Sequence, residues 1–461
     1  MNKNKSDEIL LKLRLLEEEN TRLKEENAYL KFELDRLKGE VYKKRPGKDD
    51  PPPTAGDPPK KRGGRFGHLG WFRKKPNKVD RTEEVKLEFC PDCGSKNITE
   101  CKNKDIDEHI QEDIVLPRVE AVLYRRHEYY CPNCRKVVSG VGKDELLNSY
   151  IGPKAKAFAA FLRYGIKISE RDVRDLFEKA FNLKIVASAI TGFRYQLKRA
   201  GSPLYELLKK SLKEGTFIHC DETGWGVDGK LCWLWKASNK KICFSHIDES
   251  RGQKVVEKIL GDKYDGTLIT DFLSAYNKIE TPAKQRCLVH LFRDLEKVEE
   301  YWHDDTEVLD YVRRLKKIFE DAIVLYNEYK DSRWDKSYCH RRQGLKESLK
   351  DFGFPNPNKK ILKRFAKRLG RYKDELLTFL YKKNVDFHNN HAEQQIRPDV
   401  IFRKITFGNR SWKGAEYHSV IMSILQTARL NKIDPISTFE DLLLKKKQYP
   451  LYTALSPPLP S

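Results

Sequence analysis

Thr216-Phe-Ile-His-Cys-Asp-Glu-Thr-Gly-Trp-Gly226 is the segment from which the fold of this chain can be worked out. Its apolar start, which includes a β-branched residue, predicts a buried strand, Phe217 to Cys220, that leads into Asp221. Two more apolar runs follow after short turns, and they predict strands from Leu231 to Ala237 and from Ile242 to Ile247. The sequence therefore indicates a three-stranded meander at the start of an α/β domain.

The residues after this meander continue the α/β pattern. We expect a helix from Gly252 to Leu260 and then a strand, Thr267 to Thr270, that ends on Asp271. A further strand-like piece, Gln285 to Val289, runs into a helix that begins near His290. Three meander strands followed by alternating helices and strands have the order of a ribonuclease-H-like fold, an open sheet in which ligands bind at the strand ends.

Three acidic residues stand where such a sheet could use them. Asp221 and Asp271 follow predicted strands, and Glu393 lies in the helical segment Asn389-Asn-His-Ala-Glu-Gln-Gln-Ile-Arg-Pro398. Hard divalent cations take oxygen ligands, so two strand carboxylates with one helix carboxylate are typical of a Mg²⁺ site. A metal pair held in this way can activate a water and stabilise the leaving oxygen of a phosphodiester. The pattern indicates a polynucleotidyl transferase.

The composition favours a nucleic-acid partner. The 461 residues contain 90 Lys and Arg against 68 Asp and Glu, and the formal net charge of +22 attracts a polyanion. General solubility is the alternative explanation for this charge. No run approaches the roughly 20 apolar residues of a membrane span and no signal peptide opens the chain, so we expect a cytoplasmic protein without a membrane partner. Ten cysteines are too few for a disulfide scaffold and favour metal-bound or free thiols.

Residues 1 to 42 carry a heptad repeat. The d positions are apolar throughout: Ile9, Leu16, Leu23, Leu30 and Leu37. Asn20 and Asn27 occupy a positions, where Asn favours a parallel two-stranded register, and all four g-to-e′ pairs are opposite in charge. We expect a parallel coiled coil that forms a homodimer, with a charged helix packed on its own domain as the alternative.

The next segment, residues 43 to 85, is dense in proline, glycine and charge and cannot bury enough surface to fold by itself. We expect a linker. Its basic runs would either lie along DNA phosphates or form a solvated spacer.

Two C-P-x-C knuckles follow the linker, Cys90 with Cys93 and Cys131 with Cys134. Four thiolates in two such turns suit tetrahedral Zn²⁺, and the long interval between the pairs fits a zinc ribbon with its knuckles on separate hairpins. A redox pair would explain either knuckle alone, but not the presence of two. We therefore expect one structural Zn²⁺.

Residues 150 to 212 return to a helical period. Apolar sets around Phe158, Val173 and Ile190 predict short helices. The basic residues of the last helix lie on its other face: Arg194, Lys198 and Arg199. These helices would form either a helix-turn-helix reader of DNA or a plain helical packing domain.

Taken in order, these motifs resemble the insertion-sequence-66 transposases, bacterial enzymes of the DDE class. The resemblance covers essentially the whole chain. It includes the zipper, the linker motif Gly63-Gly-Arg-Phe-Gly-His-Leu-Gly70, the paired knuckles and D-E-T after the first strand. It continues with the C-x-x-H of Cys287 and His290, and then with N-N-x-A-E, R-P, R-K and G-x-x-x-G-A-E.

This resemblance implies that Asp221, Asp271 and Glu393 are the catalytic triad and hold two Mg²⁺ ions, with Mn²⁺ as a substitute. The motif residues that we expect to face DNA are His290, Arg293, Arg397, Arg403 and Lys404. For His290 a structural role is the alternative, and for Arg397 a surface salt bridge.

The expected layout is multidomain: 1 to 42 coiled coil, 43 to 85 linker, 86 to 140 zinc ribbon, 150 to 212 helical DNA-binding domain, 213 to 295 and 385 to 435 ribonuclease-H-like core, 296 to 384 helical insertion, and 436 to 461 C-terminal tail. The expected activity is metal-dependent cleavage of transposon 3′ ends and strand transfer into target DNA. The partners would be double-stranded DNA, a second copy of the chain and accessory proteins of the element, in a bacterial, nucleoid-associated setting. A non-catalytic DNA-binding derivative and a ribonuclease-H-type nuclease without strand transfer are the alternatives.

Overall fold

The structure is a computed structural model, and it describes residues 18–31, 33–34, 119–125, 127–131, 133, 136–139, 141–329, 334–352 and 359–455. The chain divides into two compact units, one made of residues 45–118 and the other of the remaining residues. All described residues belong to the second unit. Cys90, Cys93 and Cys134, the linker and most of the heptad repeat lie outside the described residues.

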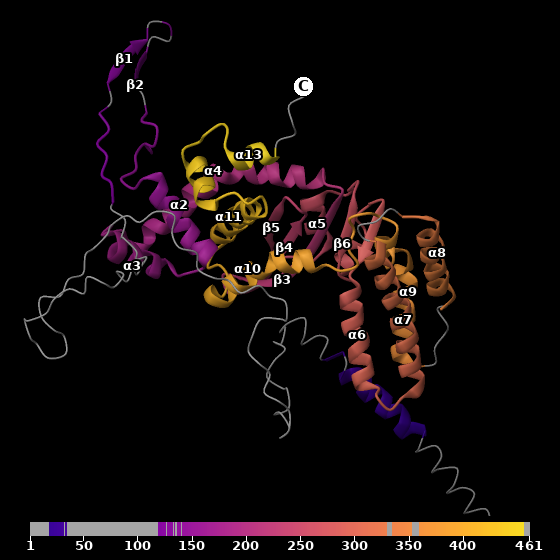
Figure 1. Ribbon diagram of the computed structural model, residues 1–461. Coiled ribbons are helices and arrows are strands. Elements are labelled where there is room, and N and C mark those ends of the chain that lie inside the picture. Colours follow the sequence, from indigo (N-terminus) through magenta and orange to yellow (C-terminus); the bar gives the residue numbers. More distant parts are fainter. Residues whose placement is uncertain are drawn as a thin grey trace, which may run out of the picture. The chain divides into compact units, whose positions relative to one another are not determined.

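A five-stranded mixed sheet organises the described part of the chain, with the strand order β5-β4-β3-β6-β7 (Figure 1). β3 (Phe217–Val227), β4 (Lys230–Ser238) and β5 (Cys243–Asp248) form the antiparallel meander. β6 (Thr267–Thr270) pairs parallel with β3, and β7 (Ala283–Arg286) pairs parallel with β6. The expected mixed α/β architecture is confirmed.

The first hairpin is longer than the sequence suggested. β3 continues through Asp221 to Val227 and pairs with β4 along this whole length. Asp228 and Gly229 form the turn with φ values of 50° and 74°, the left-handed pair that a two-residue hairpin loop requires. β3 ends at Val227, seven residues after the predicted strand end at Cys220, because the Asp-Gly turn closes the hairpin there. Asp221 therefore lies inside the strand.

Three further features differ from expectation. β7 (Ala283–Arg286) begins two residues earlier and ends three residues earlier than the predicted strand from Gln285 to Val289, because helix α6 (Leu288–Tyr301) already starts at Leu288. The helix expected between β6 and β7 is only a 3₁₀ turn, η2 (Ser274–Tyr276). The stretch expected as a C-terminal tail contains two helices, α12 (Pro435–Leu443) and α13 (Pro450–Leu455).

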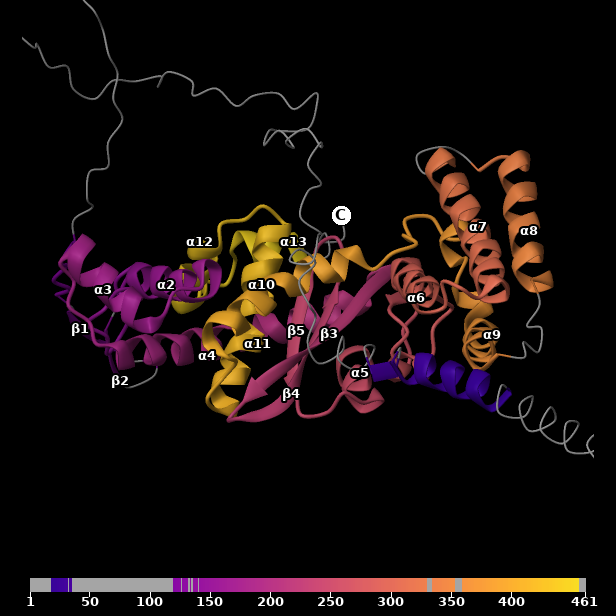
Figure 2. The same cartoon turned by 90° about the horizontal axis from the view of Figure 1, so that it is seen from below.

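Helices cover the sheet on both faces (Figure 2). α10 (Asn390–Thr406) contacts β3 and β4, and α11 (Trp412–Leu430) contacts β5 and α4 (Ala187–Lys213). Side chains alternate along β3, so that His219, Asp221 and Trp225 face α10 and α11 while Glu222 faces α5 (Gln253–Leu260) and η2. The large apolar core between sheet and helices includes Trp235, Leu268 and Ile424.

The remaining helices form two smaller groups. α2 (Pro153–Phe161), the π-helical turn η1 (Leu162–Ile166) and α3 (Glu170–Phe181) share an apolar cluster with the start of α4. The insertion between the two parts of the core has a separate apolar cluster, to which five of its elements contribute: α6, α7 (Thr306–Tyr329), α8 (Lys336–Asp351), α9 (Lys360–Tyr372) and η4 (Thr378–Leu380). The short turn η3 (Lys373–Glu375) lies between α9 and η4 and has no buried residue.

Two pieces of the N-terminal region are described. Residues 18–31 and 33–34 are helical, and Leu23, Leu30 and Leu34 are exposed on this helix. β1 (Glu128–Cys131) pairs antiparallel with β2 (Lys136–Ser139), so Cys131 of the second knuckle lies at the end of a strand and pairs with Lys136. Among the described residues, no helix combines the length and apolar character that crossing a membrane requires.

Candidate active site

Asp221 is held in the central strand of the sheet. Its side chain is buried, with 5 % of the residue exposed, and its Oδ1 accepts a hydrogen bond of 3.0 Å from the backbone N–H of Glu222. Across the antiparallel ladder Asp221 pairs with Lys236 of β4. The backbone that carries this carboxylate is therefore fixed by the β3–β4 ladder.

Asp271 follows the last residue of β6. The parallel register pairs Phe217 with Thr267 and His219 with Ile269, and extending it by two residues brings Asp271 beside Asp221. The backbone at this point is anchored by Arg286 of β7, whose Nη1 donates to the Asp271 carbonyl at 2.8 Å. Arg286 is fully buried and forms an ion pair with Glu375, so the backbone at Asp271 is held in place by a fixed side chain.

Glu393 lies in the first turn of α10, where the helix dipole favours negative charge. Its Oε1 is 3.9 Å from Nδ1 of His290, and its Oε2 is 4.0 Å from a guanidinium nitrogen of Arg293. Both partners come from α6, so the structure brings the C-x-x-H segment and the N-N-x-A-E segment together.

Asn389 fastens the start of α10 to the strand that carries Asp221. Its Nδ2 donates to the Cys220 carbonyl at 2.8 Å, and its Oδ1 lies 3.1 Å from Nδ1 of His219. Its backbone N–H donates to the Cys287 sulfur at 3.2 Å, and the Glu393 N–H donates back to the Asn389 carbonyl. The segments that carry Asp221, Asp271 and Glu393 therefore meet at one edge of the sheet.

The electrostatics of this edge are negative. Burial, and then the charge of Asp271, raise the pKa of Glu222 to about 7, although Arg251 and Tyr276 both hydrogen-bond its carboxylate. Burial also raises the pKa of the Cys220 thiol, and the charges of Asp221, Glu222 and Asp271 raise it further. An oxygen donor set in a negative field is chemically suited to a hard divalent cation.

The side chains themselves are not gathered around one point. Within the described residues, no group of three or more His, Cys, Asp or Glu side chains is close enough to hold a metal ion. Each carboxylate here has a separate partner. Asp271, for example, accepts a hydrogen bond from the backbone N–H of Leu273 at 2.9 Å.

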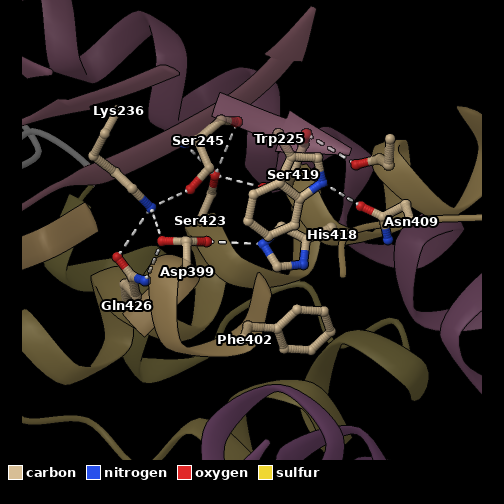
Figure 3. Close-up of polar contacts among 12 residues, drawn as sticks. Trp225, Lys236, Ser245, Asp399, Phe402, Asn409, His418, Ser419, Ser423 and Gln426 are labelled. Carbon is tan, nitrogen blue, oxygen red and sulfur yellow. Dashed lines mark hydrogen bonds and ion pairs between the residues drawn. The ribbon is translucent and has the colours of Figure 1, made fainter. Parts of the chain in front are cut away.

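A buried ionic network sets the position of α10 (Figure 3). Lys236 of β4 forms a 2.8 Å ion pair with Asp399 of α10, and neither side chain is exposed to solvent. Gln426 of α11 donates to Asp399 at 3.1 Å and accepts from Lys236 at 3.2 Å. His418 of α11 is 2.8 Å from the other Asp399 oxygen. This network joins β4, α10 and α11. Asp399, its member on α10, lies six residues after Glu393.

The charge state of this network follows from its geometry. Burial alone would raise the pKa of Asp399, but Lys236 and His418 outweigh burial and hold it at about 2. Burial likewise would lower the pKa of Lys236, and Asp399 reverses this and raises it. The pair therefore stays ionised, while burial lowers the pKa of His418.

The predicted DNA-facing residues occupy different environments. Arg397, Lys404 and Arg199 are exposed and form no ion pair with any residue that the structure describes. Lys198 is 3.1 Å from Glu416. Arg403 is half-buried and donates to Thr223 of β3 at 3.1 Å, so it ties α10 to the strand.

Arg194 is already engaged within the protein. It pairs with Glu170 at 2.8 Å, and its side chain is only 12 % exposed. The guanidinium of Arg194 is therefore occupied by a contact within the helical domain. Its position at the start of α4, opposite the first turn of α3, explains the pairing.

Sequence reasoning missed four residues that position the site: Asn389, Arg286, and the ion pair formed by Lys236 and Asp399. A lysine within the apolar run of β4 and an arginine within the short β7 were visible signals, because a charge in a buried strand needs a partner. Nothing in the sequence identified those partners.

Comparisons with known proteins give a consistent result. A family model described as "Transposase IS66 family" matches residues 148–417, more than half of the chain. The chain is also similar to "Uncharacterized protein y4qI" of Sinorhizobium fredii (strain NBRC 101917 / NGR234). The two are 23 % identical over 374 residues, which cover 73 % of this chain and 67 % of that protein.

Proposed function

Because the chain belongs to the IS66 family of transposases, we propose that it cuts the 3′ ends of a DNA element and joins them to target DNA, with Asp221, Asp271 and Glu393 as the catalytic residues. The observation that carries this proposal is the meeting of their three segments at one sheet edge. Asn389 ties the helix of Glu393 to the strand of Asp221, and the sheet register brings Asp271 alongside.

The three carboxylates would hold two Mg²⁺ ions, or Mn²⁺ in their place. When bound, such ions lower the pKa of an attacking water and stabilise the leaving oxygen of a phosphodiester. The protein itself supplies rigid placement of the three acids. Arg293 and His290 stand next to Glu393 and would bind the phosphate oxygens on the DNA side of that carboxylate.

The rest of the chain would hold the DNA and the partner copy. Exposed Arg199 and Arg397 are free to contact phosphates. Leu23 and Leu30, which are d positions of the proposed homodimer through residues 1 to 42, are exposed on the described helix, whereas Ala28 and Tyr29 of the same helix pack against the apolar cluster of the insertion. The proposed Zn²⁺ would be held by Cys90, Cys93, Cys131 and Cys134.

A joining assay tests this function against its alternatives. A duplex labelled at the 3′ end of the element's terminal repeat is mixed with the full-length protein, Mg²⁺ and an unlabelled second duplex. A transposase transfers the label to the second duplex. A nuclease without strand transfer releases the label without joining it, and a non-catalytic DNA-binding protein only shifts the duplex in a gel.

A further inference from the structure

A row of exposed residues runs along α10 away from Glu393. At 100° per residue, Glu393, Arg397, Ile401 and Lys404 fall within an arc of about 80° on the helix surface. Arg397, Ile401 and Lys404 are exposed, so charge and apolar surface alternate along the row. The row leads to Phe407, the residue that ends the helix.

Phe407 is the most exposed large apolar residue of this region, with 86 % of the residue accessible to solvent. It adopts φ 59°, a left-handed conformation in which glycine or asparagine is usual and a bulky residue is uncommon. Backbone strain of this kind persists where the surrounding structure enforces it, and it concentrates at functional sites.

The backbone around Phe407 is fixed to the β3–β4 hairpin. Asn409 N–H donates to the Gly226 carbonyl at 2.8 Å, and the Asn409 side chain accepts from Nε1 of Trp225 at 2.8 Å (Figure 3). A Cβ on Gly226 would meet the Phe407 carbonyl oxygen at 2.6 Å, so the close approach requires glycine at this position. Phe407 is therefore an apolar ring on a rigid support.

The surroundings of this ring are basic and apolar. Between Arg403 and Lys413 the chain contains four cations and no acidic residue. Leu231, which pairs with Gly226 in the hairpin, is 69 % exposed. The nearby acids are Asp228 in the hairpin turn and Glu416, which faces Lys198. Exposed apolar patches mark interaction sites, and a cationic rim selects an anionic partner.

We propose that Phe407 stacks on a base of the bound DNA while Lys404, Arg410 and Lys413 hold the adjacent phosphates. This inference rests on the proposed function and adds a contact that is remote from the catalytic acids. An aromatic ring offers a stacking surface to any base, and cations beside it follow the backbone.

The helix geometry predicts where on the DNA this contact falls. From Glu393 to Phe407 α10 rises about 1.5 Å per residue, or about 20 Å in all. With α10 placed parallel to the DNA axis, a strand that advances about 3.4 Å per nucleotide puts the stacked base about six nucleotides from the phosphate that is cut.

Fluorescence of 2-aminopurine tests the proposal. The base analogue is placed singly at each of the first ten positions of either strand, in a duplex that ends at the boundary of the terminal repeat. The full-length protein is added without Mg²⁺ or Mn²⁺, so that no strand is cut. We expect a fluorescence change centred about six nucleotides from the end, absent with Phe407→Ala and retained with Phe407→Tyr.

Affinity measurements separate stacking from general loss of binding. Phe407→Ala should weaken binding about 5- to 150-fold, because stacking of one base on an aromatic ring contributes about 1–3 kcal/mol. It should leave the salt dependence unchanged, whereas Lys404→Gln with Arg410→Gln should reduce the slope of log affinity against log salt by about two. Tyr452→Ala, which removes an exposed aromatic ring from α13, is the matched control and should change neither quantity.

The results distinguish this inference from the proposed function. If the wild-type protein binds the duplex but no position responds, or if Phe407→Ala gives the same response and affinity as wild type, stacking by Phe407 is wrong and the transposase proposal stands. If the wild-type protein does not bind the duplex at all, both fail. Since Phe407 is exposed, its replacement should leave the unfolding transition unchanged, and a large shift would overturn the assignment to binding.

Discussion

Replacement of Lys236 by methionine should be among the most damaging single substitutions in this protein. The change removes the ammonium group that faces Asp399 at 2.8 Å and leaves a fully buried carboxylate without its cation. Breaking one side of a buried ion pair typically costs about 3–5 kcal/mol, a large part of a typical stability of about 5–15 kcal/mol. His418 and Gln426 still contact Asp399, so the lower half of that range is expected.

Urea denaturation followed by tryptophan fluorescence measures this loss as a decrease in the free energy of unfolding. Lys230→Met is the matched control, because it makes the same change at an exposed position of the same strand and should alter stability by less than about 0.5 kcal/mol. The double variant Lys236→Met with Asp399→Leu should recover much of the loss, because a buried pair replaced by apolar residues costs little. A single-variant loss below about 1 kcal/mol, or losses that simply add in the double variant, would refute this account of the network.

Three further predictions concern other parts of the chain. Glu222→Gln should flatten the pH dependence of the unfolding free energy between about pH 4.5 and 7. Because the pKa of Glu222 is raised in the folded state, the folded protein binds one more proton than the unfolded chain in this window, and wild-type stability falls as pH rises. An equally steep fall in the variant would contradict the assignment. Purified, freshly reduced protein should contain one zinc per chain by elemental analysis, and Cys131→Ser should lower this content; protein without zinc would disprove the ribbon. Leu23→Ala with Leu30→Ala should shift the full-length protein from dimer to monomer in sedimentation at micromolar concentration, because these d positions supply most of the coiled-coil stability, and an unchanged dimer would reject the heptad frame.

The order of strands was predictable from the sequence because it depends on local pattern. Apolar runs separated by short turns located the sheet strands of the core, and the acid at the end of β6 was placed correctly. The length of β3 was not predictable from the sequence, since it depends on pairing with β4 and not on the hydrophobicity of β3 itself. The pairing carries the strand through Asp221, Glu222 and Thr223, which are polar.

The positioning of the site was beyond local reasoning. Asn389 contacts Cys220 and Cys287, which are distant in sequence, and Lys236 meets Asp399 only after the sheet and α10 have formed. A helix face likewise does not reveal its own partner: Arg194 was expected to reach DNA, and in the structure it meets Glu170 of the preceding helix. Such contacts are decided by tertiary packing.

The rate of 3′-end cleavage in the variants Asp221→Asn, Asp271→Asn and Glu393→Gln tests the central claim most directly. Each substitution keeps the shape of the side chain and removes a charged ligand, so several kcal/mol of transition-state stabilisation should be lost, which corresponds to at least a ~100-fold slower rate. DNA affinity should be retained, and Glu320→Gln, the same change at an exposed position of α7, should cleave at the wild-type rate. Near wild-type cleavage by any one of the three variants would remove that residue from the catalytic triad.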